Sequence, residues 1–513
     1  MIDVNKAKQK ILDLAIRGKL TKQLKSDGNA ADLLVEIQKE KEKQNIGARK
    51  TQPYTVGANS ASPNTNNDSE MPFEIPDSWV WCRFDELYDI NPEVIANNND
   101  KAAFIPMEKI GAGYNNKFDY IIQDWEAASK AHTKFCDGDV CFAKISPCFE
   151  NRKSFIANNL PNGIGAGTTE LIVLRQNKVL KEFTYLIVLD ERFIFECSKS
   201  YKGVVGQQRI KREILENYLI PLPPLAEQNR IVEIVDKLFE ILDKIDESQK
   251  KYQKDKEILK SKIIEAGIRG KLTKQLKTDG NASDLLDEIR KEKEKLIEEG
   301  KIKLDKKETY IYKNPKDNLY YEKYQDGTEK CINDELPFEI PDSWVWCRLE
   351  NLCDIVNGFT PLRSNKAYWD NGDIPWFTIE DIRHQGRIIT KTEQHITKEA
   401  LSKDSKRIIP KDSVLLCCTA SVGEFAYTKI PLTTNQQFNG LVIKRCYKYF
   451  ILPLYLFTFS QTLKKQIIQR AGGTTFGFLS VGELAKFLVS ISPLSEQKRI
   501  INIVENLLAY IDD

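Results

Sequence analysis

The stretch PLPPLAEQNRIVEIVDKLFEILDKIDESQKKYQKDKEILKSKIIEAGIRGKLTKQLK, which begins at Pro221, predicts the element around which the rest of the chain is arranged. Residues at heptad spacing define an apolar stripe: Ile231, Leu238, Ile245, Tyr252, Leu259 and Ala266, with Ile234/Val235, Ile241/Leu242 and Ile263 in the half-heptads. This spacing is typical of a helix with one apolar seam and charge elsewhere. Pro223 and Pro224 mark its start, since proline is tolerated in a first turn, and Gly267 and Gly270 weaken its far end. We expect two successive long helices over 221–295, the first roughly 60 Å long.

The same element occurs again in two separate pieces. Residues 16–43 and 268–295 differ at only four positions, so the N-terminus carries the distal half of the element. Residues 493–513 parallel 224–246, so the C-terminus carries the proximal half. A third repeat, PFEIPDSWVWCR, is identical at 72–83 and 337–348. These repeats predict two tandem half-molecules with pseudo-twofold symmetry, and not a solenoid of many repeats.

Length and composition narrow the class of protein. A chain of 513 residues is too long for one hydrophobic core, so several domains are expected. Its 76 Lys and Arg against 74 Asp and Glu leave it nearly neutral, so overall charge gives no support for nucleic-acid binding. The charged start has no signal-peptide core, no apolar window reaches the length of a membrane span, and the 11 cysteines are scattered. We therefore expect a cytoplasmic protein with reduced thiols and no membrane partner.

The pattern along the chain predicts an α+β fold in which long helices separate two globular, mixed α/β domains. The predicted segments are a helical piece at 1–43, a flexible linker at 44–70, a globular domain at 71–222, a central helical spacer at 223–300, a second linker at 301–335, a second globular domain at 336–492 and a helical piece at 493–513. Short β-branched runs such as 140–145 and 171–175 predict strands. The apolar stretches 183–200 and 449–470 predict helices, each followed by a glycine loop.

The two halves differ in an informative way. Their long helices and the segments that lead into the globular domains are nearly identical, but the globular interiors share hardly any residues. A protein that performed one reaction twice would keep its active-site residues in both halves. A protein that reads two different targets would keep the frame and vary the reading surface, so the contrast favours a reader.

No catalytic constellation stands out in the sequence. The three histidines, His132, His384 and His395, have no metal-ligand spacing, and the cysteines form no C-x₂-C pairs. There is no G-x-x-x-x-G-K-[ST] phosphate loop and no G-x-S-x-G elbow. The Gly-rich loop and N/D-P-P-aromatic tetrapeptide of a DNA adenine methyltransferase are also missing. The sequence does not exclude the carboxylate pair of a nuclease, because matches to that motif arise by chance in a chain this charged.

The chain resembles the specificity subunits of type I restriction–modification systems over nearly its whole length. The resemblance is carried by two P-L-x-E-Q motifs, at 224–228 and 493–497, each followed by a heptad helix and preceded by a glycine loop and a short strand. GDVCFAKI, which begins at Gly138, resembles the family's G-D-hydrophobic strand, and PKDSVL, which begins at Pro410, is a weaker counterpart. The order of these short motifs, and their repetition, makes the match specific.

The resemblance implies that each globular domain is a target recognition domain that reads one half of a split site in double-stranded DNA. It implies long helices that pair antiparallel like a coiled coil, set the spacing between the half-sites and hold two modification subunits, which restriction subunits then join. The chain itself would be non-catalytic and hold no cofactor. Adenine methylation and DNA cleavage, with S-adenosylmethionine, ATP and Mg²⁺, would belong to the partner subunits in host defence. A stiff spacer would turn two weak half-site contacts into one strong contact by effective concentration.

Contacts to DNA require Lys or Arg for phosphates and Arg, Lys, Asn, Gln, Ser or Thr for base edges. In the first domain the candidates are Lys202, Gln207, Gln208, Arg209 and Lys211 in the glycine loop, and Lys144, Ser146, Arg152 and Lys153. In the second they are Thr474, Thr475, Arg383, His384, Gln385, Arg387, Thr419, Ser421, Asn435, Gln436 and Gln437. Residues 349–492 hold 18 Lys and Arg against 12 Asp and Glu, whereas 84–222 hold 17 against 19. Charge therefore favours a DNA face only in the second domain, and a basic face in the first must be local.

Two other interpretations remain. A nuclease or methyltransferase fused to target domains predicts activity of the isolated chain with Mg²⁺ or S-adenosylmethionine. A structural adaptor that docks proteins through its helices predicts no DNA sequence preference. The near-identical repeats also suggest the hypothesis that recombination exchanges the globular domains and so changes specificity.

Overall fold

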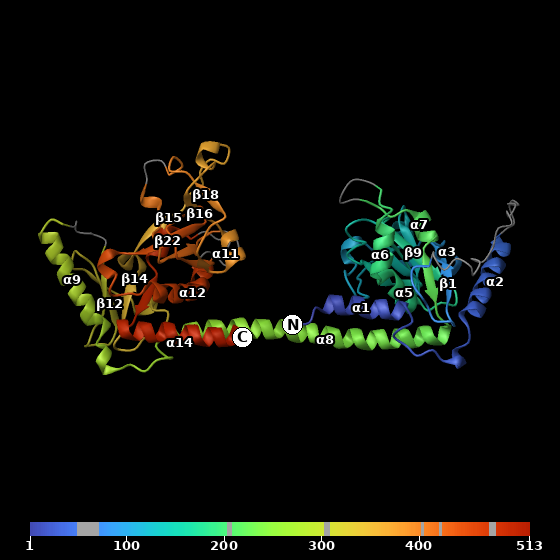
Figure 1. Cartoon of the computed structure of the whole chain (residues 1–513), viewed down its shortest axis with the longest axis horizontal. Coiled ribbons are helices and arrows are strands. Elements are labelled where there is room, and N and C mark those ends of the chain that lie inside the picture. The colour runs from blue at the N-terminus through green and yellow to red at the C-terminus, as the bar shows by residue number, and fades with distance from the viewer. Residues whose placement is uncertain are drawn as a thin grey trace. The chain divides into compact units, whose positions relative to one another are not determined.

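The computed structural model describes residues 1–48, 71–202, 208–301, 308–401, 405–419, 423–470 and 479–512. These residues form two compact units, Met1–Lys251 and Tyr252–Asp513, each with one globular domain and its own helices (Figure 1). The longest helix, α8 (Leu225–Ile268), gives its first part to one unit and its last part to the other. None of the described helices is long and apolar enough to cross a membrane.

The first unit surrounds two four-stranded sheets. One has the order β2 (Tyr88–Ile90), β9 (Leu171–Gln176), β6 (Val140–Ala143), β7 (Ser154–Ile156), and the other β4 (Ile121–Asp124), β3 (Lys101–Ile105), β8 (Ile164–Gly167), β5 (Thr133–Cys136). A separate antiparallel pair joins β1 (Val80–Arg83) to β10 (Leu219–Leu222). The helices besides α8 are α1 (Val4–Ile16), α2 (Ala30–Ala48), α3 (Phe84–Leu87), α4 (Trp125–Ser129), α5 (Lys181–Leu189), α6 (Glu191–Ser198) and α7 (Arg212–Glu216).

Strand β6 and the first four residues of β9 are apolar because both of their faces are covered. Side chains alternate along a strand, so Val140 and Phe142 face the cluster formed with α5 and α6, while Cys141 faces the second sheet. The predicted helix over 183–200 is in fact two helices, α5 and α6, separated at Asp190. The backbone of Asp190 is extended, and its carboxylate accepts a hydrogen bond from Arg192 (2.9 Å). Aspartate favours such a break because it competes with helical backbone bonds.

The second unit repeats the order of the central strands with different residues, although its two sheets have five and three strands instead of four and four. Its larger sheet has the order β15 (Cys353–Asn357), β22 (Phe438–Ile443), β19 (Ser413–Cys417), β20 (Phe425–Thr428), β17 (Ile388–Ile389), and its smaller sheet β18 (Gln394–Ile396), β16 (Ile374–Phe377), β21 (Thr433–Thr434). The pair β14 (Val345–Arg348) and β23 (Leu488–Ile491) matches β1 and β10. The remaining helices are α9 (Ala282–Glu298), α10 (Leu349–Leu352), α11 (Ile379–Gln385), α12 (Pro453–Arg470), α13 (Val481–Ala485) and α14 (Leu494–Asp512). The second sheet of the first unit and the smaller sheet of the second unit each contain one parallel pair, β3 with β8 and β16 with β21. The shared outline predicted for the two halves is therefore a shared order of the central strands.

The long helices pair antiparallel within each unit, as predicted. In the first unit Lys8 of α1 donates to Asp243 of α8 (2.6 Å), and the backbone amide of Ile2 donates to Gln249 (2.7 Å). In the second unit α14 runs beside the end of α8, where Lys260 pairs with Asp512 (2.5 Å) (Figure 1). The predicted apolar seam of α8 is only partly covered.

Burial along that seam follows the packing of α8. Ile231, Val235 and Leu242 are buried, whereas Ile241, Tyr252 and Leu259 are 53%, 60% and 48% exposed. The helix thus keeps an apolar surface along its middle.

The segment predicted as a second linker, 301–335, is instead largely folded. It contains an antiparallel sheet of β11 (Tyr310–Lys313), β12 (Tyr320–Lys323) and β13 (Glu329–Cys331). Ile311 of β11 packs against the buried Trp346. The buried carboxylate of Glu322 accepts two hydrogen bonds from Arg348 of β14, at 2.6 and 3.1 Å. Composition did not predict this sheet, because Arg348, which anchors it, lies outside the segment. The first predicted linker, 44–70, lies mostly outside the described residues.

Candidate nucleic-acid interface

A buried glutamate fastens each globular domain to its long helix. In the first unit Glu227 is fully buried, and its Oε2 accepts a hydrogen bond from the indole of Trp79 (2.8 Å). Its Oε1 accepts bonds from the hydroxyl of Thr21 (2.6 Å) and the amide of Gln23 (2.8 Å). Glu227 comes from the P-L-x-E-Q motif, Trp79 from PFEIPDSWVWCR and the other two from the IRGKLTKQLK repeat. Three repeated motifs therefore meet at one carboxylate.

The second unit reproduces this joint. Glu496, also fully buried, accepts hydrogen bonds from Trp344 (2.9 Å), Thr273 (2.6 Å) and Gln275 (2.7 Å). The adjacent Gln497 donates to the carbonyl oxygen of Phe450 (2.8 Å) and accepts from the amide of the residue before α12. The residues that are identical in the two halves thus join each globular domain to its helix. This structural role explains why they are identical without any contact to DNA.

A glycine that occurs in both repeats allows the IRGKLTKQLK segment to pack closely against the I-P-D-S-W segment. Gly18 has a φ of +66°, and a Cβ there would lie 2.4 Å from Cγ of Pro76. Gly270 has a φ of +69°, and its Cβ would lie 2.6 Å from Pro341. Both glycines combine a left-handed backbone with a close approach to the proline of the I-P-D-S-W segment, so neither position accepts a side chain.

The structure brings two groups of predicted residues of the first domain together. The amide of Ser146 donates to the carbonyl oxygen of Gln208 (2.8 Å), and the amide of Ile210 donates to the carbonyl oxygen of Lys144 (3.1 Å). The loop after β6 and the end of the glycine loop therefore lie side by side. Lys202 forms a β-bridge with Arg209, and Lys211 lies two residues after Arg209. The predicted Gln207 lies outside the described residues.

Several predicted cations of the first domain are held by internal partners. The Arg209 guanidinium bonds both oxygens of Glu170 (2.6–3.1 Å) and holds the pKa of that carboxyl below its usual range. Arg152 stacks on Tyr114 (4.8 Å), pairs with Glu191 and leaves only 12% of its side chain exposed. The ammonium of Lys153 donates to the carbonyl oxygen of Met107 (2.7 Å). Arg152 and Lys153, the last two residues of the loop after β6, therefore use their side chains to support the domain.

The predicted basic residues of the second domain are also neutralised locally. Arg383 pairs with Glu380 on its own helix, and His384 lies against the carboxylate of Glu393. Arg387 stacks on Phe425 (4.1 Å) and pairs with a carboxylate oxygen of Glu424 (3.4 Å). The remaining member of this group, Gln385, accepts hydrogen bonds from Thr390 and donates to the carbonyl oxygen of Lys391.

A second group of predicted residues gathers beside β21. Asn435, Gln436 and Gln437 form the turn between β21 and β22, and the amide of Cys418, next to Thr419, donates to the carbonyl oxygen of Gln437 (3.0 Å). The predicted Ser421, Thr474 and Thr475 lie outside the described residues.

The same two loops meet in both domains. In the first domain, the amide of Ile210 donates to the carbonyl oxygen of Lys144, just after β6. In the second domain, the amide of Leu479 donates to the carbonyl oxygen of Cys418, just after β19 (3.0 Å). Each contact joins the loop that follows the central strand to the segment that leads into α7 or α13. These loops are where the sequences diverge and where the predicted DNA residues concentrate.

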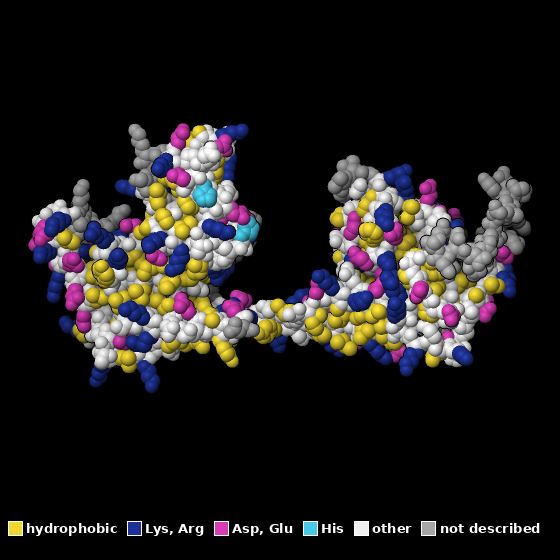
Figure 2. All heavy atoms as spheres, viewed as in Figure 1, with side chains coloured by type: hydrophobic (Ala, Val, Ile, Leu, Met, Phe, Trp, Pro, Cys, Tyr) yellow, Lys and Arg dark blue, Asp and Glu magenta, His cyan; other side chains and the backbone are white. Residues whose placement is uncertain are grey.

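On the face that Figure 2 shows, Lys and Arg do not gather into one basic patch. Figure 2 shows Lys and Arg side chains interspersed with Asp and Glu over the visible surface of both units.

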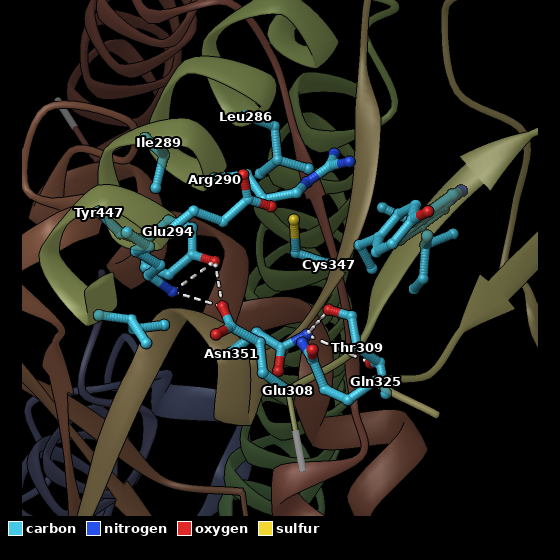
Figure 3. Close-up of a pocket in the computed structure, with 15 residues that line it drawn as sticks. Leu286, Ile289, Arg290, Glu294, Glu308, Thr309, Gln325, Cys347, Asn351 and Tyr447 are labelled. Carbon is cyan, nitrogen blue, oxygen red and sulfur yellow. Dashed lines mark hydrogen bonds and ion pairs between the residues drawn. The ribbon is translucent and has the colours of Figure 1, made fainter. Parts of the chain in front are cut away.

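The second unit also contains a pocket of about 160 Å³ between α9 and β11 (Figure 3). Lys293 there bonds Glu308 and the hydroxyl of Tyr447 (3.3 Å), and Asn351 donates to the carbonyl oxygen of Thr309 (2.6 Å). Burial raises the pKa of the lining Cys347 to about 12, so its thiol is neutral and a poor nucleophile. Within the described ranges, no group of three or more His, Cys, Asp and Glu side chains could hold a metal ion.

Comparison with known proteins decides the family. The family model of the type I restriction modification DNA specificity domain matches residues 76–253 and 341–512. The chain belongs to this family. The type I specificity family predicted from the repeated P-L-x-E-Q motifs is therefore confirmed, and each of the two matches begins in a repeated I-P-D-S-W segment and continues into a long helix.

Relatives in the type I specificity family align with most of the chain. The specificity subunit of the type I restriction enzyme EcoAI of Escherichia coli is 27% identical, over 98% of this chain and 89% of that protein. The EcoEI specificity subunit of the same species is 30% identical, over 70% of this chain and 63% of that protein. A chain from a solved structure of a type I restriction–modification system superposes with a TM-score of 0.59 at 18% identity, covering 86% of this chain and 93% of its own length. That likeness concerns the fold.

Proposed function

We propose that this chain is the DNA-recognition subunit of a type I restriction–modification complex, in which each globular domain reads one half of a bipartite DNA site. One observation carries the proposal. The two domains share the order of their central strands and the Glu–Trp joint, yet differ in nearly every residue of the loops after β6 and β19. A conserved frame with divergent loops is what two readers of different half-sites require.

The proposed reading surface of the first domain comprises 144–146 together with 208–211. That of the second comprises 419 and 435–437 and the loop at 358–363, which packs against them. The amide of Phe359 donates to the carbonyl oxygen of Thr434 (2.8 Å), and the hydroxyl of Thr360 bonds the side chain of Gln436. These loops present amides and hydroxyls suited to base edges. Arg152 and Lys153, which the sequence also suggested, serve the frame in this proposal.

The partners follow from the helices. Tyr252 and Leu259 on α8, and Tyr510 on α14, are 60%, 48% and 83% exposed, although they belong to apolar stripes. We propose that two modification subunits cover these stripes and that restriction subunits join them. The modification subunits would bind S-adenosylmethionine and methylate adenine, and the restriction subunits would use ATP and Mg²⁺. The complex would act in the cytoplasm, on DNA within the cell.

A methylation map tests the proposed function. The chain is co-expressed with the modification subunit encoded beside it, and modified adenines in host DNA are located by long-read sequencing. We expect one motif with two short fixed halves and a constant gap. A stable complex without any sequence-dependent modification would instead favour the structural adaptor. Cleavage or methylation by the isolated chain would favour a fused enzyme.

A further inference from the structure

One exposed arginine of the second domain, Arg363, is held by aromatic rings. Its guanidinium carbon lies 3.9 Å from the ring centre of Trp369 and 4.6 Å from that of Trp376. The two indoles meet edge to face, with an interplanar angle of 89° and centroids 5.1 Å apart. They therefore form a corner that restricts the guanidinium in two directions.

The corner is tied to the loop that carries the arginine. Trp376 is 2% exposed within β16, and its indole donates to the carbonyl oxygen of Phe359 (3.0 Å). The indole of Trp369 donates to the carbonyl oxygen of Leu362 (3.2 Å). Loop and rings fix one another, so the position of Arg363 is set before any partner binds.

A glutamine sets the orientation of the guanidinium. Nη1 of Arg363 donates to Oε1 of Gln394 (2.7 Å), which lies directly across from Trp376 in the β16–β18 ladder. That bond occupies one of the two terminal nitrogens of the guanidinium group. Among the described residues, no carboxylate pairs with Arg363, and the edge formed by Nε and Nη2 makes no hydrogen bond.

This arrangement differs from that of three arginines predicted as DNA contacts from the sequence. Arg209, Arg383 and Arg387 each face a carboxylate of their own domain. A fork that is oriented but lacks an internal anion is ready to meet two acceptors outside the protein. A planar fork suits paired acceptors such as guanine O6 and N7, whereas a phosphate is served as well by a flexible point charge.

We propose that Arg363 is a specificity-determining residue that reads a guanine in the major groove of the half-site recognised by the second domain. Gln394 is its positioning residue. The proposal rests on the proposed function and adds to it a residue and a base. The hydrogen bond from Thr360 to Gln436 places the loop of Arg363 beside the turn at 435–437, so one surface would carry both.

The methylation map of variants tests this inference. In Arg363→Ala and Arg363→Lys complexes, we expect the requirement for one G·C pair in one half of the motif to relax by roughly 5- to 150-fold, the range of one bidentate base contact. The lysine keeps the charge, so loss of discrimination in that variant separates base reading from simple attraction. Gln394→Met should relax the same position to a smaller extent. The other half of the motif should stay unchanged, which shows that the complex has folded.

A matched control is Arg290→Ala. Arg290 also stacks on an aromatic ring, Tyr310 (4.2 Å), but it pairs with Asp287 on α9 outside the globular domain. The methylation motif of the Arg290→Ala complex should equal that of the unaltered complex. An unchanged motif in Arg363→Ala would overturn the proposal. An equal loss of methylation at all sequences, with no change in base preference, would identify a phosphate contact and overturn it as well. If the unaltered complex gives no bipartite motif, the proposed function itself fails.

Discussion

The buried joint at Glu227 leads to a quantitative prediction. Replacing Glu227 with alanine leaves the indole N–H of Trp79, which is 5% exposed, without its acceptor. A buried donor left unsatisfied costs about 1–3 kcal/mol, and hydrogen bonds to a charged group contribute about 1.5–3 kcal/mol each. Thr21 and Gln23 lie near the surface and can turn to water, which offsets part of their loss. We therefore expect Glu227→Ala to destabilise the first domain by about 3–5 kcal/mol.

The joint occurs twice, so the prediction has an internal replicate. Glu496→Ala should destabilise the second domain by a similar amount, because its three hydrogen bonds have nearly the same lengths. Glu233→Ala is the matched control, since that glutamate is on the same helix, is 64% exposed and, among the described residues, forms an ion pair with Lys237 alone. Such a surface pair adds little to stability, because water and salt screen it.

Hydrogen exchange on the intact chain gives the assay, because it reports the opening free energy of each domain separately. Protection should fall in 72–222 for Glu227→Ala and in 337–492 for Glu496→Ala. If Glu227→Ala lowers protection no more than Glu233→Ala does, the buried carboxylate is not what holds the domain to its helix.

Three further predictions concern charge and docking. Arg230 donates a hydrogen bond to Asp27 (2.5 Å) and lowers the pKa of that carboxyl. The pair therefore adds stability at neutral pH, and this stability is lost as the pH falls through the lowered pKa. In a plot of melting temperature against pH, Asp27→Asn should reduce the fall below about pH 4. Arg348→Ala leaves the Glu322 carboxylate buried without its cation and should cost about 3–5 kcal/mol in urea unfolding, whereas Arg83→Ala, at the matching exposed position of the first repeat, should cost less than about 0.5 kcal/mol. An equal cost for both arginines would show that the β11–β13 sheet is not anchored this way. Leu259→Asp should reduce co-purification of the modification subunit while leaving the melting temperature of the chain unchanged, and undiminished co-purification would move the docking surface elsewhere.

The frame was predictable because its residues occur twice. The three repeated motifs marked the pieces that meet at Glu227 and Glu496, and heptad spacing predicted α8. The folded sheet at 310–331 was missed because Glu322 is anchored by Arg348, which lies beyond it in the sequence. Residue type alone predicted a linker there.

The candidate site was only partly predictable for a related reason. Residue types identified loops that do meet, such as 144–146 with 208–211. They did not show that Arg152 is tied to Glu191, because that ion pair joins residues far apart in the sequence. Arg363 went unnoticed because its orientation depends on Trp376 and Gln394, on two strands that only the fold brings together. A tryptophan six residues after the arginine was the one local signal.

The central claim is that each domain independently reads one half of the site, and a chain with a duplicated first domain tests it most directly. Residues 84–218 would replace 349–487, between the repeated strands that both domains share. Methylation mapping should then show one motif whose two halves are the first half-site repeated in inverted orientation, with the gap kept. A folded complex that still methylates the original two different halves would contradict the account.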